Sequence, residues 1–214
     1  QDGFYYDMLR GPDGRHVPLR VRSMVGIIPL FSTKIIGEDD VAGAQAMRKG
    51  FAAIARRRGT DEEDVREAGI LVDFGGKRRM VVGVAARGRV RRILAHLLDE
   101  DSFLSRYGLR AVSRWHADHP FSVEMPGYTA TIDYEPAEST TGMFGGNSNW
   151  RGPLWMPLNY LVLRTLDDYY AHLGESVTAE YPTGSGQQRH AGEVAEDLRQ
   201  RLLSLYRRGS DGRR

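Results

Sequence analysis

The chain has 214 residues, of which 30 are basic and 28 acidic, so that its formal net charge is +2. This length is enough for one domain with a hydrophobic core, and the near balance of charge argues against a dedicated nucleic-acid binder. Because the chain contains no cysteine, disulfides and thiolate metal sites are excluded, and we expect a reducing, cytoplasmic location. The longest apolar stretch, residues 24–31, is far too short to span a bilayer, so no membrane partner is expected.

The first part of the chain predicts a hairpin and the beginning of a buried helix. The turn-forming residues 11–14 (Gly-Pro-Asp-Gly) separate two extended stretches and therefore predict a β-hairpin. Residues 25–31 are apolar and predict a buried helix whose first turn holds Pro29, the place where a helix tolerates proline.

Two helices are predicted in the next hundred residues. Apolar side chains recur at three- and four-residue steps over residues 38–58, and Gly59 supplies a stop. Residues 88–98 show the same spacing and predict a second helix. Between them, residues 78–84 are compatible with either a strand or an irregular loop.

The remaining residues predict one more hairpin and two further helices. Residues 102–113 are expected to form a loop with at most one helical turn, and alternation over residues 128–134 predicts one strand of a small hairpin. A long loop follows over residues 135–152, then a helix that Gly174 terminates, and a last helix over residues 193–206. The sequence therefore predicts a mainly α fold with small β-hairpins in the connections.

The loop over residues 142–155 carries the chemistry that stands out most. Its glycines let a backbone approach a ligand closely, and Asn149 and Arg151 offer several hydrogen-bond donors suited to sugar hydroxyls. Trp150 and Trp155 provide flat apolar faces on which a pyranose can stack. The alternative is that both tryptophans belong to the core and the glycines only shape a turn.

Three segments resemble one enzyme family. Residues 149–161 (NWRGPLWMPLNYL) are similar to the WRGPxWxPxNYL stretch of bacterial glycoside hydrolase family 63-like proteins, which are relatives of processing glucosidase I and of mannosylglycerate and glucosylglycerate hydrolases. Residues 2–7 (DGFYYD) and 21–31 (VRSMVGIIPLF) resemble the DGFFYD and VRSMVGLIPLF segments of that family. Shorter matches follow in the same order, and the resemblance is weakest between about residues 34 and 87.

The resemblance implies a fold and a mechanism. Members of this six-hairpin glycosidase superfamily form an (α/α)6 toroid, of which residues 1–214 would be an incomplete C-terminal portion of one catalytic domain. They hydrolyse an α-glycosidic bond with inversion, using one carboxylic acid to protonate the leaving oxygen and one carboxylate, about 6.5–9.5 Å away, to activate water. The general-acid Asp is expected before this chain and the general-base Glu after it. We therefore expect the chain alone to be inactive and its partner to be the remainder of its own catalytic domain.

The resemblance also implies which residues contact the carbohydrate substrate. No catalytic residue is expected within the chain, and the predicted substrate-binding residues are Trp150, Arg151, Trp155, Asn149 and Asn159. The carboxylates in the matching segments are predicted to be structural: Asp2, Asp7, Asp133, Glu135 and Glu138. If the alignment of motifs were wrong, Asp7 and Glu138 would be the alternatives for catalysis.

No cofactor and no metal are expected. His116 and His119 lie three residues apart and could share a helix face, but zinc would need further ligands that the neighbouring sequence does not offer. Three functions remain open at this point: a glycosidase, a non-catalytic carbohydrate-binding protein, and a helical structural remnant. Trp150 and Trp155 would discriminate the last of these, depending on whether they line a cleft or pack in a core.

Overall fold

The computed structural model describes residues 2–11, 14–31, 33–57, 69–83, 87–125, 127–136, 153–208 and 212. Its α-helices within these ranges are α1 (Val41–Arg57), α3 (Arg87–Leu97), α4 (Met156–Leu173) and α5 (Ala191–Ser204). Shorter 3-10 segments are η1 (Met24–Phe31), η2 (Glu38–Asp40), η3 (Arg114–Ala117) and η4 (Gly174–Ser176). The four predicted helices that follow η1 are thus confirmed, with boundaries that shift by at most three residues over the described positions.

The strands of the described residues all pair antiparallel. Four two-stranded ribbons are β1 (Asp7–Arg10) with β2 (His16–Leu19), β6 (Leu104–Ser105) with β7 (Gly108–Leu109), β8 (Phe121–Met125) with β9 (Tyr128–Ile132), and β10 (Thr178–Glu180) with β11 (Gln188–His190). A three-stranded sheet has the order β3 (Lys34–Ile36), β5 (Lys77–Val82), β4 (Gly69–Phe74). The hairpins predicted around residues 11–14 and at residues 128–134 are confirmed, and residues 77–82 form a strand rather than an irregular loop. The two short ribbons β6/β7 and β10/β11 were not predicted.

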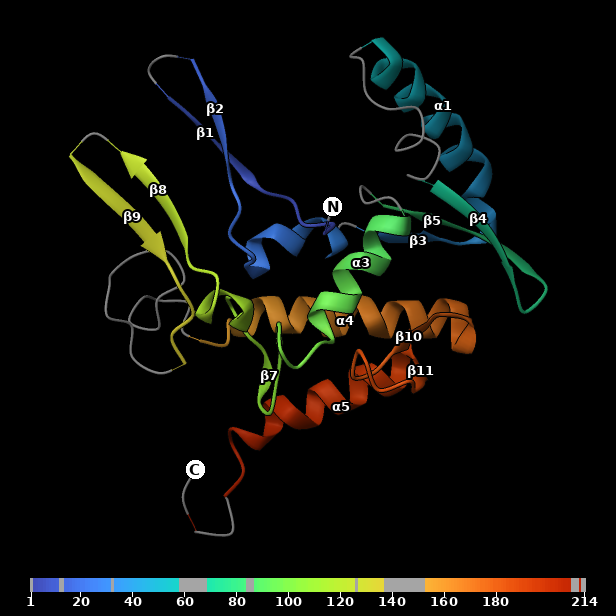
Figure 1. Cartoon of the computed structure of the whole chain (residues 1–214). Helices are drawn as coiled ribbons and strands as arrows, with labels where there is room; N and C mark the ends of the chain where they lie inside the picture. Colours follow the sequence, from blue (N-terminus) through green and yellow to red (C-terminus); the bar gives the residue numbers. More distant parts are fainter. Residues whose placement is uncertain are drawn as a thin grey trace.

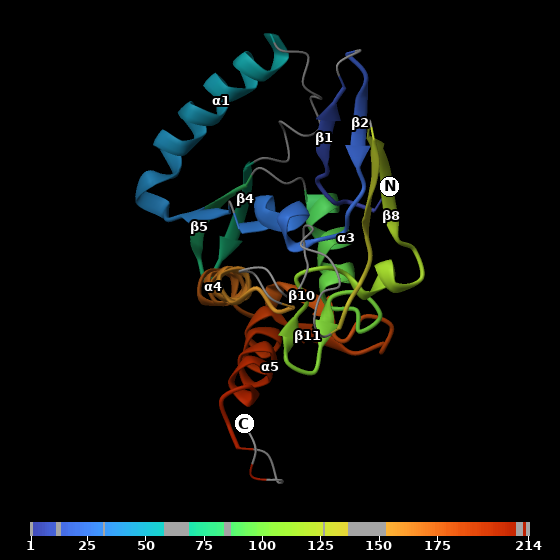
Figure 2. The same cartoon turned by 90° about the vertical axis from the view of Figure 1, so that its left-hand side faces the viewer.

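The elements are arranged around two long helices. In Figure 1, α4 runs across the middle of the molecule with α5 below it, and α3 stands against α4 from above. The ribbons β1/β2 and β8/β9 project from one end, while α1 and the β3–β5–β4 sheet project from the other. Figure 2, turned by 90°, again places β1/β2 beside β8.

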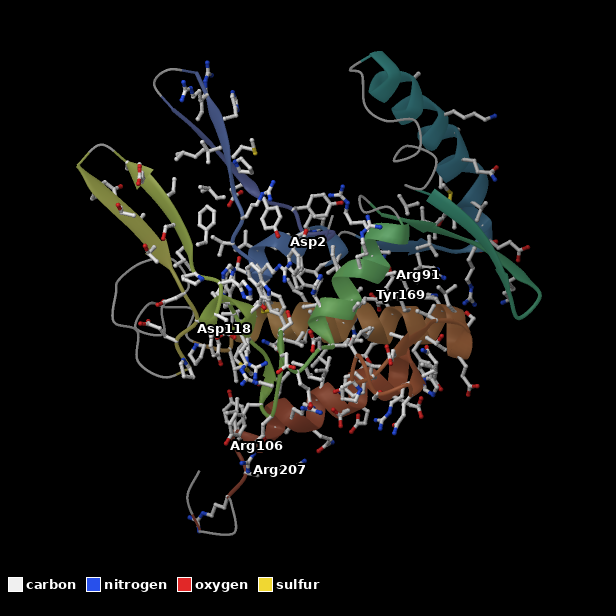
Figure 3. The ribbon with its side chains drawn as sticks, viewed as in Figure 1. Asp2, Arg91, Arg106, Asp118, Tyr169 and Arg207 are labelled. Atoms are coloured by element: carbon white, nitrogen blue, oxygen red, sulfur yellow. The ribbon has the colours of Figure 1, made fainter. Side chains whose placement is uncertain are left out.

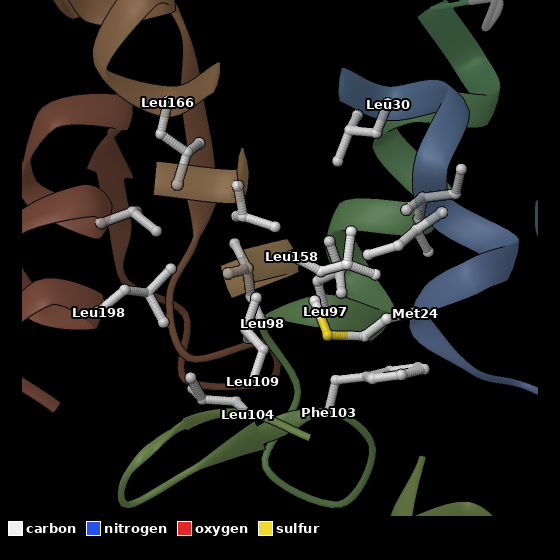
Figure 4. Packing of buried hydrophobic residues seen from close by; sticks show 14 of the residues in the cluster. Met24, Leu30, Leu97, Leu98, Phe103, Leu104, Leu109, Leu158, Leu166 and Leu198 are labelled. Atoms are coloured by element: carbon white, nitrogen blue, oxygen red, sulfur yellow. The ribbon is translucent and has the colours of Figure 1, made fainter. Parts of the chain in front are cut away.

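The main core lies where η1, α3, α4 and α5 meet. Eighteen buried side chains form it, among them Leu97 and Phe103, both fully buried, and Leu198 at 2% exposure. Figure 4 shows 14 of them, which lie between η1 and α3 on one side and α4 and α5 on the other. Such close-packed burial is the main stabilising contribution expected for the fold.

The segment predicted as an α-helix at residues 25–31 is instead the 3-10 helix η1, and Pro29 is its sixth residue rather than part of a first turn. In a 3-10 helix side chains three residues apart lie above one another. Met24, Ile27 and Leu30 follow this spacing, and all are at most 2% exposed. A short apolar run does not distinguish the three-residue period of a 3-10 helix from the start of an α-helix, so the type of helix differs from the prediction.

The toroid itself stays a prediction, since these elements do not make a closed ring of helical hairpins. Of the helices within the described ranges, none combines the length and the apolar composition needed to cross a bilayer.

Candidate functional site

Two of the five predicted substrate-binding residues fall within the described chain. Asn149, Trp150 and Arg151 lie outside it, whereas Trp155 and Asn159 stand at the beginning of α4. The structure therefore describes the two predicted residues that lie where the sugar-binding loop joins α4.

Asn159 is 2% exposed, and both polar atoms of its side-chain amide form hydrogen bonds with backbone groups. Its Nδ2 donates to the carbonyl oxygens of Leu109 at 3.0 Å and Trp155 at 3.2 Å, while its Oδ1 accepts from the Leu109 N–H at 2.8 Å. Gly108 has φ +120°, and a Cβ at this position would lie 2.7 Å from Leu202 Cδ2. Asn159 thus fastens α4 to β7 through a close approach that glycine permits. Its contact with a sugar stays a prediction.

Trp155 is the N-cap residue of α4 and packs, half-buried, against the main core. Its carbonyl oxygen accepts from the N–H groups of Leu158 and Asn159, both at 3.1 Å. Two residues earlier, Pro153 O accepts from Ala111 N–H at 2.8 Å, and Ala111 O in turn accepts from the N–H of Met24 at 2.9 Å. The end of the predicted loop is therefore fixed to the first residue of η1.

An ionic cluster surrounds the beginning of the chain. Asp2 accepts from the Tyr6 hydroxyl at 2.5 Å and from Phe4 N–H at 3.3 Å, and it lies 3.4 Å from the guanidinium of Arg22. Burial favours a higher pKa for Asp2, but the hydrogen bond from Tyr6 and the charge of Arg22 outweigh it and lower the pKa. Burial and the neighbouring carboxylate raise the pKa of Tyr6 to about 12. Figure 3 shows Asp2 near the middle of the molecule, above α4 in that view.

His116 and His119, the two histidines considered as metal ligands, make hydrogen bonds and ring contacts close to Arg22 of this cluster. His116 is fully buried; its Nε2 accepts from the backbone N–H of Arg22 at 2.8 Å, so its Nδ1 carries the proton and donates to His119 O at 2.8 Å. Trp115 is sandwiched between the Arg22 guanidinium, 4.2 Å from its centroid, and the parallel ring of His119 at 4.1 Å. Burial lowers the pKa of His116, which favours the neutral imidazole. Across the ranges that the structure describes, no three His, Asp or Glu side chains converge as metal ligands.

Little in the sequence indicates this cluster. Arg22 and His116 are separated by 94 residues, and only the four-residue step from Asp2 to Tyr6 is visible locally. Asp2 serves here as an ion-pair and hydrogen-bond partner. Asp7 and Asp133 are exposed, while Glu138 lies outside the described residues.

Comparison with known proteins matches residues 79–213 to the Mannosylglycerate hydrolase MGH1-like glycoside hydrolase domain. The chain belongs to this family of glycoside hydrolases. The match spans all five residues predicted to bind the substrate. The chain is also 36% identical over 213 residues to the uncharacterized protein YMR196W of Saccharomyces cerevisiae, covering 100% of this chain but 19% of the yeast protein.

A cleft of about 280 Å³ separates the ribbons β1/β2 and β8/β9. Its walls come from both ribbons, and its floor from the residues around the beginning of η1, including Ser23 and Gly26. Ser23 pairs with Val112 in an isolated β-bridge, one residue from the Ala111 position that holds Pro153. Residues 111–112 thus contact both the floor of the cleft and the anchored end of the predicted loop.

Proposed function

We propose that the protein containing this chain hydrolyses an α-glycosidic bond with inversion of the anomeric configuration. The chain would supply the substrate-binding loop, while the general-acid Asp and the general-base Glu would come from outside residues 1–214. The observation that carries the proposal is membership of a glycoside hydrolase family through residues 79–213, a range that includes the whole WRGPLW segment.

The residues of the loop have distinct proposed roles. Trp150 stacks on the apolar face of the sugar, and Asn149 and Arg151 donate hydrogen bonds to its hydroxyls. Trp155 packs half-buried against the main core, so it offers the sugar only the part of its ring that stays exposed. Asn159 acts as a positioning residue, because its amide already holds the first turn of α4 against β7. The substrate class is a glucoside, a glucosyl- or mannosylglycerate-like solute, or an oligosaccharide.

The outer sides of α4 and α5 support the proposal that the chain packs against further helices of the same catalytic domain. Tyr160 and Leu161 on α4 are 61% and 40% exposed, and Leu203 on α5 and Tyr206 just beyond it are 40% and 67% exposed. Large apolar side chains left exposed on neighbouring helices commonly mark an interface. The proposed covering element is the rest of an (α/α)6 toroid, and the chain is then one portion of it.

The test uses the full-length protein and a panel of α-linked disaccharides together with glucosylglycerate and mannosylglycerate. The anomer released first is read by proton NMR before mutarotation, and we expect the β-anomer from an α-linked substrate. Trp150→Ala should lower kcat/KM at least tenfold, because a stacking contact made to the sugar is lost. Trp115→Phe is the matched control, since this tryptophan is already covered on both faces.

Release of the α-anomer would contradict inversion, and absence of hydrolysis across the panel would leave a non-catalytic carbohydrate-binding protein as the better account. Equal loss of activity in Trp150→Ala and Trp115→Phe would indicate a general effect on folding rather than a contact with substrate.

A further inference from the structure

The ribbon β8/β9 presents two chemically different faces. Alternation places the side chains of Phe121, Val123, Met125, Tyr128, Ala130 and Ile132 along the cleft. The side chains between them are polar and face away, and among these Ser122 and Thr131 share a hydrogen bond at 2.8 Å. The apolar face is only half-buried, so it stays accessible to a ligand.

The opposite wall and the floor come from the N-terminal part of the chain. Tyr5 and Tyr6 both line it, and the side chain of each has a partner: the guanidinium of Arg89 lies 4.4 Å from the ring centroid of Tyr5, and the hydroxyl of Tyr6 donates to Asp2. At Gly26 an added Cβ would lie 2.8 Å from Tyr5 O, which shows how tightly η1 supports this floor. The rings are therefore preorganised rather than free to fill the cleft.

The rim of the cleft carries one negative charge. Asp7 is exposed, and it is the only charged residue among the described residues that line the cleft. Tyr128, 58% exposed, stands near the ribbon tip, and its hydroxyl donates to Met125 Sδ at 3.0 Å. Aromatic and aliphatic walls beside a single carboxylate suit a ligand that has an apolar face and neutral hydroxyl donors.

We propose that this cleft binds a neutral pyranose ring of an oligosaccharide, with the C–H face of the sugar against the ribbon walls and its hydroxyls donating to Asp7. A hydrocarbon ligand would remove water from the Asp7 carboxylate without replacing its hydrogen bonds, which is costly. An anionic group such as a glycerate would meet a carboxylate and, among the described residues that line the cleft, no cation. The inference rests on the proposed function for its choice of substrate, and it narrows that choice to neutral oligosaccharides.

The volume and position of the cleft agree with a subsite rather than with a complete binding pocket. About 280 Å³ is just below the range for small-molecule sites, which is on the order of 300–1,000 Å³. Ala111 and Val112, which follow β7, connect the floor to Pro153, where the predicted sugar-binding loop ends. One oligosaccharide could therefore contact both regions.

The test measures kinetics and binding in the full-length protein. For a neutral α-linked trisaccharide, we expect Asp7→Asn to raise KM about tenfold, as hydrogen bonds to a charged acceptor are lost, and to change kcat less than KM. Tyr128→Ala should raise KM several-fold, and both variants should affect glucosylglycerate much less. Glu124→Gln removes an equivalent charge from the outward face of the same ribbon and is the matched control.

Saturation-transfer NMR with maltotriose provides a readout that does not depend on hydrolysis. If no glycoside is cleaved but maltotriose binds and Asp7→Asn weakens it, the proposed function fails and the subsite stands. If Glu124→Gln has the same effect as Asp7→Asn, or if Asp7→Asn lowers kcat while KM is unchanged, the subsite is wrong. Binding that Tyr128→Ala abolishes and Asp7→Asn leaves intact would indicate an apolar occupant and would also overturn it.

Discussion

The main core and the ribbon cleft both consist mainly of aliphatic and aromatic side chains, but those in the cleft are more exposed to solvent. In the core, Ile93, Leu97 and Phe103 are completely buried, enclosed by three α-helices and η1. In the cleft, Val123 is half-buried and Tyr128 is 58% exposed, because each wall is a ribbon of only two strands. Two strands cannot bury one face by themselves. The difference indicates that the core holds the chain together, whereas the cleft keeps apolar surface available.

The strongest test of this comparison is a pair of truncations. Leu97→Ala should lower the free energy of unfolding by about 3–5 kcal/mol, because it removes buried methyl groups and leaves a cavity. Val123→Ala should cost about 1 kcal/mol or less, since its side chain keeps contact with solvent and less burial is lost. Urea unfolding followed by circular dichroism measures both. Comparable losses would show that the ribbon is as much part of the stabilising core as α3.

Much of the core side of this comparison could be predicted from the sequence. The helices α3, α4 and α5 each carry an apolar repeat over three or more turns, and such a long repeat leaves little ambiguity. Alternation was enough to find β9, although the second strand of its ribbon was not named.

The remaining features depend on contacts between distant residues. The strands β6 and β7 have two residues each, too few to show a period, and they form because Gly108 lets Asn159 reach Leu109 across 50 residues. The role of Asn159 as a backbone clamp cannot be derived from the NYL motif, which is equally compatible with a sugar contact. In the same way, nothing near Asp7 in the sequence indicates that β8/β9 lies opposite it.

A second prediction extends the comparison from apolar to polar side chains. Asn159→Leu should cost about 2–3 kcal/mol, because the Leu109 N–H and C=O lose their partners while remaining buried. Tyr160→Ala, at the next position of α4, should change stability by about 0.5 kcal/mol or less, since Tyr160 is 61% exposed. Urea unfolding of the two variants gives the contrast. A small effect of Asn159→Leu would mean that β6/β7 can detach from α4 without loss of the core.

A third prediction concerns the phenol of Tyr181, which donates to Asp197 on α5. Burial and this carboxylate raise the pKa of Tyr181 above its usual value. Tyr181→Phe should lower the free energy of unfolding by about 1 kcal/mol, which is less than the effect of Asn159→Leu. The reason is that Arg201 Nε still donates a hydrogen bond to Asp197 at 2.6 Å. The control is Tyr170→Phe, which keeps the ring stacked on His190 at 4.8 Å. Unfolding midpoints that fall equally in both variants would show that the hydroxyl contact with Asp197 adds nothing specific.

The smallest expected effect concerns how the free energy of unfolding depends on pH, which should differ between the interior and the ribbons. Burial lowers the folded-state pKa of His116, so the unfolded chain binds more protons once the pH falls toward the ordinary histidine value of about 6.5. The stability contributed by neutral His116 is therefore fully present above that value and is lost as the pH falls through it toward the folded-state pKa. Between pH 7.5 and 6.5 the loss should be about 0.4 kcal/mol at most, because an unfolded histidine is only partly protonated there.

His116→Asn should flatten this slope, measured as the free energy of unfolding in urea at pH 7.5, 6.5 and 5.5. His96, whose pKa is lowered by burial and by Arg22, keeps its own contribution in the variant, so some slope remains. The exposed His16 on β2 provides the matched control for the loss of an imidazole, through His16→Asn. An identical slope in His116→Asn and His16→Asn would mean that the buried imidazole is not what couples this core to pH. The interior and the ribbons would then differ in apolar packing alone, and not in how their stability depends on pH.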